Sequence, residues 1–599
     1  MTDPIRIANC SGFYGDRLSA AREMVEGGPI DVLTGDWLAE LTMLILARSR
    51  MSRPGGGYAR TFVKQMEQVM GTCLDGGIKV VSNAGGLDPA GCAEAVSEVA
   101  ARLGLNPKVA YVDGDDLMGG DLVSSGALIP FADGIGLGDP AAYLTANAYL
   151  GCWGIAEALE RGADIVITGR VTDAAVVCGT AAWHHGWQRD DWDALAGAVV
   201  AGHVIECSAQ ATGGNYSFFA EMDLGNPRFG FPWAEVAADG SSIIGKHEGT
   251  GGEVSIGTVT SQLLYEIGSP SYLGPDVTAR FDTISLEEVG PDRVRISGVR
   301  GQPPPPTLKV GLNELGGYRN TISVALTGLN VEEKAALAEA AFWDACSLAP
   351  GDFAEVVSQV IRTDKPDPAS NEEATAVWRL TVKDVDESKV GRAFSGAMVE
   401  TALASIPGMY LVSGGPSGGE PFGVYRPALV PAHLVPQFVH ADGQTVEVDS
   451  TSPGGEVSIE TMDTFPAAPG GPSVEAPLGS VVGTRSGDKG GDANLGVFAR
   501  SDVGWAWIDG FLSVEKLAEL LPETAAFQID RYRLPNLRSL NFVIHGLLGE
   551  GVAASTRQDA QAKSLGEWLR ARVVAIPSAV LGASSDRATS GDVERRTES

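Results

Sequence analysis

Short runs of β-branched residues alternate with longer amphipathic stretches over the first 180 residues. This alternation predicts strands joined by crossover helices, as in an α/β fold with a mainly parallel sheet. The predicted strands span 5–9, 30–34, 78–82, 109–112 and 165–168, and the predicted helices span 17–27, 36–50, 58–74, 89–103 and 151–161.

The pattern changes after residue 200. The region 200–330 holds Gly-rich segments with β-type neighbours, such as 202–217 and 245–254, and four consecutive prolines at 303–306 that exclude helix and central strand. A helical pattern at 331–346 then opens an α+β section that runs to about 460. We therefore expect one large α/β domain over 1–462, with a subdivision near 200–330.

A Pro-rich linker is predicted at 463–477, followed by a small α+β domain at 478–578 and a disordered tail at 579–599. Within the small domain the expected order is β-β-α-β-β-α. Its strands are predicted at 478–484, 494–500, 527–533 and 539–545, and its helices at 513–521 and 557–573.

Composition excludes several classes of protein. The chain has 44 Lys and Arg against 76 Asp and Glu, a net charge of −32, which disfavours binding to nucleic acid or to an anionic membrane. The seven cysteines form no CxxC pair, so neither a disulfide framework nor a zinc ribbon is expected. No apolar run approaches the ~20 residues that span a bilayer, and no secretory signal is visible. We expect a cytoplasmic enzyme, and its size favours a homo-oligomer.

Polar residues follow the predicted strands, where ligands of open α/β sheets bind. Arg170 could clamp a carboxylate and Asp173 could orient it, although an N-cap with a surface ion pair is equally expected. Asn83 and the N–H groups near Gly85 could bind a substrate oxyanion. Asp36 joins Asp173 as a catalytic candidate at these strand ends.

A second group of candidates lies at 202–217. Glu206 or His203 could act as a general base if burial shifts the pKa. A histidine satisfied in the core is the favoured alternative, and Cys207 is expected to be an inert buried thiol. Gly213, Gly214 and Asn215 form a turn that could bind substrate.

The segment 485–494 is the sharpest motif. Its Gly-rich turn could present backbone N–H groups to a carboxylate, a phosphate or a CoA pyrophosphate, with cationic neighbours. The alternative is a β-hairpin with Asp and Asn as turn residues. The candidate ligand-binding residues are Arg485, Ser486, Asp488, Lys489, Gly490, Gly491, Asp492 and Asn494.

Metal and nucleotide signatures are weak. Neither His247-Glu248 nor His184-His185 has zinc-ligand spacing, and no HExxH occurs. A hard-cation site from Asp36, Asp113, Asp115 and Asp116 stays open, although solvated turns are more common. The GxxxxGK[ST] pattern is absent, and the Gly-rich segment at 83–86 lacks the dinucleotide fingerprint.

Ten longer motifs run through most of the chain. They are GFYGDR (12–17), GDWLAELTM (35–43), SNAGGLDP (82–89), YVDGDDL (111–117), TGRVTDAA (168–175), GHVIECSAQATGGNYS (202–217), KHEGTGGEVS (246–255), QLLYEIGSPSYLGPDV (262–277), GVRGQPPPPTLKV (298–310) and RSGDKGGDANLG (485–496). Together they resemble the acyclic terpene utilisation, or AtuA-like, family, over roughly residues 5–575. The resemblance implies a C-terminal domain of ferredoxin-like fold and a role in breaking down terpenoids through CoA thioesters.

Three hypotheses about function follow. The first is an enzyme of branched acyl-CoA or small-carboxylate catabolism that uses hydratase- or lyase-type proton transfer. It needs no tightly bound cofactor, CoA is part of the substrate, and a divalent cation stays open. The second is a noncatalytic accessory or scaffold protein of a catabolic complex. The third is a metal-dependent enzyme that uses the strand-end aspartates.

Overall fold

A computed structural model describes residues 2–53, 55–132, 136–412, 417–455, 457–458 and 467–584. The chain divides into two compact units. Unit 1 comprises Met1–Asn313, Tyr425–Val552 and Asp559–Ser599, and unit 2 comprises Glu314–Val424 and Ala553–Gln558. Among the described residues, no helix is both long and apolar enough to cross a membrane.

Unit 1 is built on a mixed sheet whose strand order is β12-β13-β9-β8-β1-β2-β3-β7-β4-β20-β21. The five central strands β1, β2, β3, β7 and β4 run parallel, and antiparallel strands flank them on both sides, so a mainly parallel sheet is not confirmed. The strands are β1 (Ile5–Asn9), β2 (Val32–Gly35), β3 (Lys79–Ser82), β4 (Val109–Asp113), β7 (Ile165–Thr168), β8 (Pro232–Val236), β9 (Ser242–Lys246), β12 (Ser285–Gly290), β13 (Arg293–Ser297), β20 (Gln437–Ala441) and β21 (Gln444–Val448).

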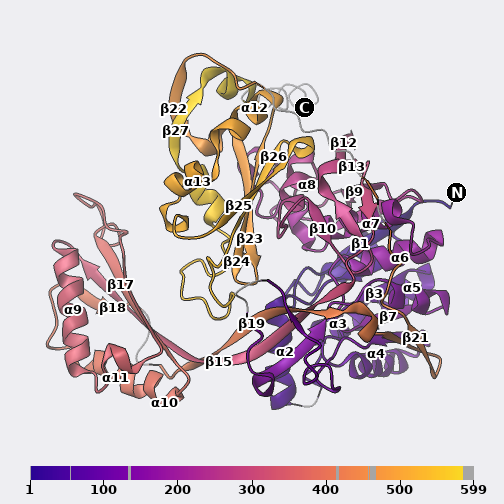
Figure 1. The fold of residues 1–599 in the computed structure, drawn as a ribbon, viewed down its shortest axis with the longest axis horizontal. Helices are drawn as coiled ribbons and strands as arrows, with labels where there is room; N and C mark the ends of the chain where they lie inside the picture. Colours follow the sequence, from indigo (N-terminus) through magenta and orange to yellow (C-terminus); the bar gives the residue numbers. More distant parts are fainter. Residues whose placement is uncertain are drawn as a thin grey trace. The chain divides into compact units, whose positions relative to one another are not determined.

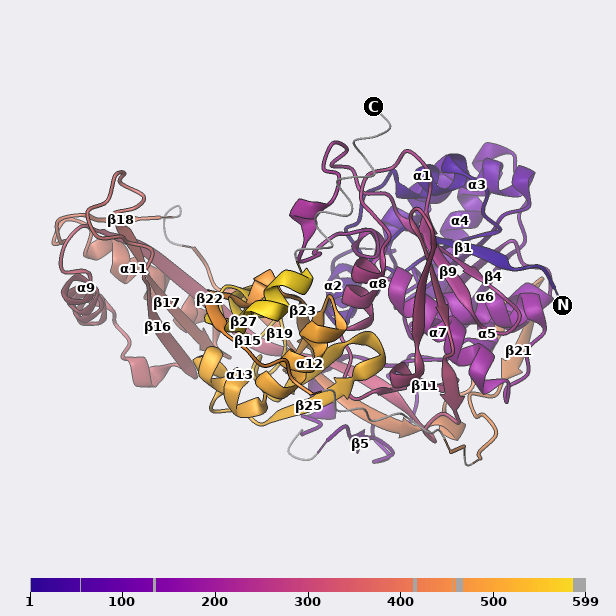
Figure 2. The same cartoon turned by 90° about the horizontal axis from the view of Figure 1, so that it is seen from above.

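Helices cover both faces of the parallel strands (Figure 2). Side chains alternate between the faces, because successive residues of a strand point to opposite sides. Ala8 and Leu33 pack beneath α1, α3 and α4, whereas Ile7 and Val32 pack beneath α5, α6 and α7. The helices of unit 1 outside its C-terminal domain are α1 (Ala20–Gly27), α2 (Glu40–Ser52), α3 (Arg60–Gly76), α4 (Pro89–Leu103), α5 (Trp153–Glu160), α6 (Ala175–His185), α7 (Trp192–Ile205) and α8 (Ile256–Leu263).

The long helix α7 departs from the sequence prediction, which gave 202–217 strand-like neighbours. Every residue from Leu195 to Ile205 is buried, so the helix has no polar face and no amphipathic period to reveal it. Gly197 and Gly202 permit this packing, since a Cβ at either position would collide with Gly240 or Ala174. Short strands complete this part of unit 1: β5 (Ile129–Pro130), β6 (Tyr143–Ala148), β10 (Ser271–Leu273), β11 (Thr278–Arg280) and β14 (Arg300–Gln302).

The C-terminal part of unit 1 carries a four-stranded antiparallel sheet in the order β23-β24-β26-β25, with helices against it (Figure 1). The predicted β-β-α-β-β-α order is present from β23 to α14, with two helices, α12 and α13, where one was expected, and with β22 and β27 added at the ends. Residues 473–477, the end of the expected linker, form a strand that pairs with β27, and residues 578–584 are helical. The elements are β22 (Ser473–Pro477), β23 (Val482–Lys489), β24 (Asp492–Ala499), α12 (Asp502–Phe511), α13 (Val514–Leu520), β25 (Ile529–Leu534), β26 (Ser539–Ile544), α14 (Leu565–Arg570) and β27 (Val573–Pro577).

Unit 2 is an antiparallel sheet covered by helices. The strands β15 (Thr307–Thr327) and β19 (Glu420–Pro431) carry the chain into and out of it, and β17 pairs with β15 over Tyr318–Thr327. Phe342, Trp378 and Phe394 form the centre of its core. Its other elements are α9 (Val331–Ala345), β16 (Glu355–Ile361), β17 (Thr375–Asp384), α10 (Glu387–Val390), α11 (Arg392–Glu400) and β18 (Met409–Leu411).

Candidate active site

Polar side chains meet at the carboxyl ends of β2 and β7. Arg170 is buried, and its Nη1 donates to Asp173 Oδ1 at 2.6 Å and to the Leu38 carbonyl at 3.0 Å. Asp36 is buried nearby and accepts a hydrogen bond from Asn83. The Asp173 side chain keeps 29% of its surface exposed, so it is the carboxylate of this group that solvent reaches.

The end of α7 supplies His203 and Glu206, which lie one helical turn apart. Asn9, at the end of β1, donates to the carbonyl oxygens of residues 205 and 206 and so fixes this helix end beside the strand ends. His203 Nδ1 lies 3.2 Å from Glu206 Oε1, but the two atoms are not aligned for a hydrogen bond. Glu206 Oε2 is buried and has no hydrogen-bond partner among the described residues.

Glu266 and Tyr272 approach the same point from the segment after α8. The Tyr272 ring packs on His203 with 5.2 Å between ring centroids, and Phe281 covers another side of the imidazole at 5.5 Å. Glu266 adopts a positive φ of 56°, which is uncommon for a residue with a side chain. Sequence analysis placed both residues in a motif but proposed a role for neither.

The β23–β24 hairpin brings Lys489 to these residues. The structure differs here from the expected Gly-rich loop, because residues 482–489 and 492–499 form a continuous antiparallel ladder. Only Gly490 and Gly491 remain as the turn, and the φ of +62° at Gly490 suits glycine. The hairpin alternative is therefore the one observed, and the ladder uses backbone N–H groups that an anion cradle would need.

Strand alternation decides which residues of the hairpin face the α/β part of unit 1. Arg485, Gly487 and Lys489 share a face. The Arg485 guanidinium stacks 4.1 Å from the Tyr265 ring, and a Cβ at Gly487 would lie 2.3 Å from that ring. Lys489 Nζ donates to the Glu266 carbonyl at 2.8 Å and lies 5.9 Å from the Tyr272 ring centroid.

Two buried asparagines of the C-terminal sheet hold the backbone around Glu266. Asn494 Oδ1 accepts from the Glu266 N–H at 2.8 Å, and its Nδ2 donates to Asn541 Oδ1. Asn541 Nδ2 donates to the carbonyls of Ile267 and Gly268 at 3.1 and 2.7 Å. This clamp of Asn494 and Asn541 satisfies buried backbone groups on both sides, so the C-terminal sheet sets the conformation of the Glu266 segment.

We call the resulting group the central cluster. Burial raises the pKa of the Glu206 carboxyl well above its ordinary value, and Asp173 and Glu266 raise it further, against Arg170 and Lys489. Burial likewise raises the pKa of Asp36 and of Glu266. Burial lowers the pKa of His203 to about 4, so its imidazole is neutral at pH 7. The central cluster consists of Asp36, Arg170, Asp173, His203, Glu206, Glu266, Tyr272 and Lys489.

A chain of polar groups that sequence analysis missed borders the cluster. Lys309 Nζ donates to Glu40 Oε1 at 2.9 Å, and the Tyr149 and Tyr425 hydroxyl oxygens are 3.3 Å apart. Arg170 lies 4.0 Å from the Tyr149 ring centroid, which connects this chain to the central cluster. Lys309 belongs to a motif quoted for the family resemblance, but its contacts are long-range, so no local pattern indicates them.

Comparison with known families completes the picture. Residues 5–441 match the model of the acyclic terpene utilisation family protein AtuA, and residues 476–575 match the AtuA ferredoxin-like domain. The chain belongs to the AtuA family. No curated protein and no solved structure matches it. The ferredoxin-like fold expected for the C-terminal domain is thereby confirmed, whereas the domain boundaries stay a prediction.

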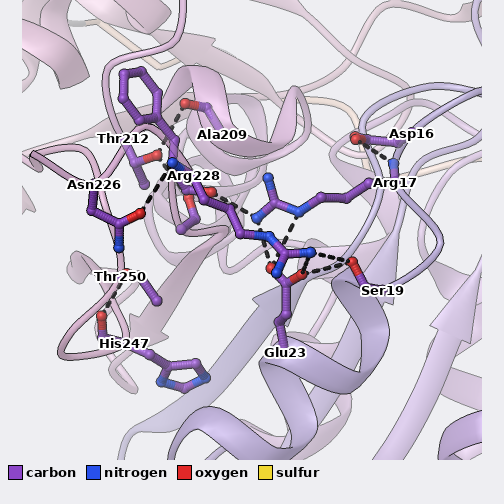
Figure 3. Close-up of polar contacts among 12 residues, drawn as sticks. Asp16, Arg17, Ser19, Glu23, Ala209, Thr212, Asn226, Arg228, His247 and Thr250 are labelled. Atoms are coloured by element: carbon purple, nitrogen blue, oxygen red, sulfur yellow. Dashed lines mark hydrogen bonds and ion pairs between the residues drawn. The ribbon is translucent and has the colours of Figure 1, made fainter. Parts of the chain in front are cut away.

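The GFYGDR motif of this AtuA protein forms a structural network rather than part of the central cluster (Figure 3). Arg17 and Arg228 both pair with Glu23, at 2.7 and 2.9 Å, and Arg228 also bonds Ser19. Thr212 Oγ1 donates to the carbonyls of Ala209 and Gly230. The neighbouring turn residues Gly213, Gly214 and Asn215 adjoin this network, and the exposed Asn215 has a φ of 58°.

The remaining candidates have partners within the fold. Ser486 Oγ accepts from the Gly566 N–H at 3.1 Å, Asp488 lies 3.5 Å from Lys563 Nζ, and Asp492 binds His545 at 3.0 Å. Asn83 is saturated by Asp36 and the Trp37 N–H, and a Cβ at Gly85 would meet the Thr168 carbonyl at 2.6 Å. Burial raises the pKa of the half-buried Cys207 thiol. Ligand binding by these residues stays a prediction.

The strand-end aspartates have separate partners. Asp113 binds His440 at 3.1 Å, Asp116 accepts from the Met118 N–H, and Asp115 accepts from Asn147 and the Arg170 N–H. Burial raises the pKa of Asp115 to about 7. Within the described ranges, no three His, Cys, Asp or Glu side chains form a group that could hold a metal ion.

A cavity of about 910 Å³ opens on the other side of β10. Ser271 and Leu273 line it, whereas Tyr272 between them packs on His203. The rest of its lining includes prolines 303–306 and residues 450–452, and its one ionisable residue is His433. Acid–base groups therefore gather at the central cluster and not in this cavity.

Proposed function

We propose that this protein catalyses hydratase- or lyase-type proton transfer on a branched acyl-CoA thioester or a related small carboxylate. The AtuA family is named for acyclic terpene utilisation, and a role in terpene catabolism suits such substrates. The observation that carries the proposal is the Glu206 carboxyl. It is buried, its Oε2 lacks a hydrogen-bond partner among the described residues, and other titratable groups surround it.

The cluster supports an assignment of acid and base. Burial and two neighbouring carboxyl groups raise the pKa of Glu206, which favours the neutral carboxylic acid, and a neutral carboxylic acid can donate a proton. Asp173 is partly exposed and held by Arg170, which suits a carboxylate that accepts a proton from substrate. The neutral His203 lies 3.2 Å from Glu206 and packs on Tyr272, which keeps water from this side of the carboxyl group.

Cationic side chains favour an anionic substrate. Arg170 interacts with the carboxyl groups of Asp36 and Asp173, and Lys309 interacts with that of Glu40. Cationic side chains gathered at one site stand out in a chain with a net charge of −32, because the rest of its surface repels anions. A carboxylate or a CoA phosphate fits this charge. A divalent cation and a homo-oligomeric assembly remain part of the proposal.

The first experiment is a thermal-shift screen of the full chain with free CoA, branched acyl-CoAs, their free acids, Mg²⁺ and EDTA. A ligand that binds the native state raises the unfolding midpoint as its sites fill. We expect a rise with branched acyl-CoAs, and then turnover that Glu206→Gln abolishes and Glu519→Gln leaves intact. Glu519 is a matched surface carboxyl, paired with Lys516. If no thioester or free acid moves the midpoint, the proposed substrate class is wrong.

A further inference from the structure

The Lys489 side chain differs from the other lysines near the active site. Part of its surface is exposed, but Nζ lies among the groups of the central cluster, and its only hydrogen bond to a described residue is the one that Nζ donates to the Glu266 carbonyl at 2.8 Å. It forms no ion pair within the described part of the chain, although it lies in a cluster rich in carboxyl groups. Lys309, by contrast, pairs with Glu40 at 2.9 Å, and Lys563 lies 3.5 Å from Asp488.

The surroundings of Lys489 also favour a neutral amine. Burial lowers its pKa, and the nearby Lys309 ammonium lowers it further, against the carboxyl groups of Glu266 and Glu40. For Lys309 itself, Tyr149 and Glu40 outweigh burial, so its pKa is raised and it remains a cation. Desolvation and a cationic neighbour are the two conditions that activate a lysine as a nucleophile.

The hairpin holds this amine in place. Lys489 is the last residue of β23, and its partner across the turn, Asp492, is anchored by His545 and by the Gly546 N–H at 2.8 Å. Tyr272 lies on one side of the amine, and the Glu206 carboxyl acts on it electrostatically. An acid, a carboxylate and an unpaired amine therefore occupy one site, which is the arrangement that imine formation requires.

We propose that Lys489 Nζ is a nucleophile that forms an imine with the ketone or aldehyde carbonyl of an anionic substrate. This inference rests on the proposed function and narrows its substrate class to oxo acids and oxoacyl thioesters. The Nζ lone pair forms the C–N bond while the carbonyl π pair moves to oxygen, which takes a proton from Glu206. Asp173 accepts the proton released by the amine and returns it to the carbinolamine hydroxyl, which then leaves as water and leaves the iminium ion. A thioester carbonyl would instead acylate the amine and expel the thiolate, so the reacting carbonyl is the ketone or aldehyde.

Borohydride trapping tests the proposal on the full chain. The protein is incubated with acetoacetate or its branched homologue 4-methyl-3-oxopentanoate, reduced with sodium borohydride, and analysed by intact mass and peptide mapping. We expect one reduced adduct per chain, on the peptide that contains Lys489. Lys489→Arg should lose the adduct, because the guanidinium keeps the charge but stays protonated. Lys516→Arg, a change in a surface lysine paired with Glu519, should retain it.

The outcomes separate this inference from the proposed function. An absent adduct, or label spread over surface lysines, overturns the role of Lys489 as a nucleophile, and mapping of the wild-type protein decides this even if a variant fails to fold. If acyl-CoAs raise the unfolding midpoint but no adduct forms, imine formation at Lys489 is excluded and the proposed function is retained. An adduct on Lys489 without any thioester shift supports the imine and removes the thioester substrate.

Discussion

Carboxyl groups in the two units have opposite electrostatic surroundings. Five carboxyl groups of unit 2 accept hydrogen bonds from cations, hydroxyl groups or backbone N–H groups, and their pKa values are lowered. Three carboxyl groups of the central cluster in unit 1 lie in surroundings that exclude water, and their pKa values are raised. The second arrangement opposes folding, and carboxyl groups with such surroundings are concentrated at the functional sites of proteins. The contrasted groups are Asp364, Glu372, Glu373, Asp384 and Asp386 in unit 2, and Asp36, Glu206 and Glu266 in the cluster.

The largest effect that sharpens this contrast is expected from lysine truncation. Lys489→Ala removes an amine that has no ion-pair partner among the described residues, and turnover should fall by roughly 10²–10⁴-fold, the usual contribution of a proton-transfer or nucleophilic group. Lys389→Ala in unit 2 breaks a pair with Asp384 at 3.0 Å and should leave turnover unchanged. The measurement is kcat/KM on the ester or oxo acid that raises the unfolding midpoint. Equal losses in the two variants would contradict the contrast.

The asparagine clamp offers the next largest effect, on stability. Asn541→Ala leaves the Ile267 and Gly268 carbonyls without a donor in a buried site, which should cost about 1–3 kcal/mol of unfolding free energy. Chemical denaturation monitored by tryptophan fluorescence measures this change. Asn371→Ala is the control, because the exposed Asn371 makes only a 3.5 Å contact with Tyr410 within unit 2. A loss no greater than that of the control would show that the clamp is dispensable.

Much of the central cluster follows from sequence rules. The five strands predicted in the first 180 residues are all present, and the rule that ligands bind at their carboxyl ends selected Asp36, Arg170 and Asp173. The rule works because parallel neighbours end at one edge of the sheet. His203 and Glu206 were also selected, and the i, i+3 spacing that joins them becomes visible once α7 is recognised as a helix.

The rest of the site depends on contacts between distant segments. Lys489 and Asn494 of the C-terminal sheet both bind the backbone of Glu266, more than 200 residues earlier in the chain, and no local pattern encodes such contacts. The same limit explains why Glu40, Lys309 and Tyr149 were missed. The motif at 485–494 was selected for its glycines, but strand alternation decides which of its residues reach the central cluster. Arg485 and Lys489 lie on the face of the strand towards the cluster, whereas Ser486 lies on the face towards the core of its own domain.

The pH dependence of stability should have opposite signs in the two regions. The pKa of Glu206 is higher in the folded state than in the unfolded state, so the folded state binds more protons. The free energy of unfolding therefore falls as pH rises from the ordinary glutamate pKa towards the pKa in the folded state. Glu206→Gln removes this penalty. The stability of the variant relative to the wild type should therefore rise as pH increases above the ordinary glutamate pKa.

Asp384 provides the matched test in unit 2. Burial raises the pKa of Asp384, but the Asp386 N–H and Lys389 outweigh burial, so the pKa is lowered in the folded state. Ionised Asp384 therefore stabilises the fold at pH values above the ordinary aspartate pKa. Asp384→Asn should lose stability at pH 7, and the loss should shrink as pH falls through the folded pKa. Midpoints of urea unfolding across the pH series measure both variants. Curves of the same sign for Glu206→Gln and Asp384→Asn would break the comparison.

The smallest effect is expected at the exposed ion pairs of unit 2. The Arg362 guanidinium contacts the Glu332 carboxylate at 2.6 Å and the Asp364 carboxylate at 2.7 Å, so these three side chains form a small network at the surface of unit 2. Solvent screens such pairs, and holding long side chains in one rotamer opposes the attraction. Arg362→Ala should therefore leave both the unfolding midpoint and the turnover unchanged within error, at low and at high salt. A salt-dependent drop in the unfolding midpoint would mean that paired surface charges of unit 2 contribute to stability. The electrostatic difference between unit 2 and the central cluster would then be one of degree.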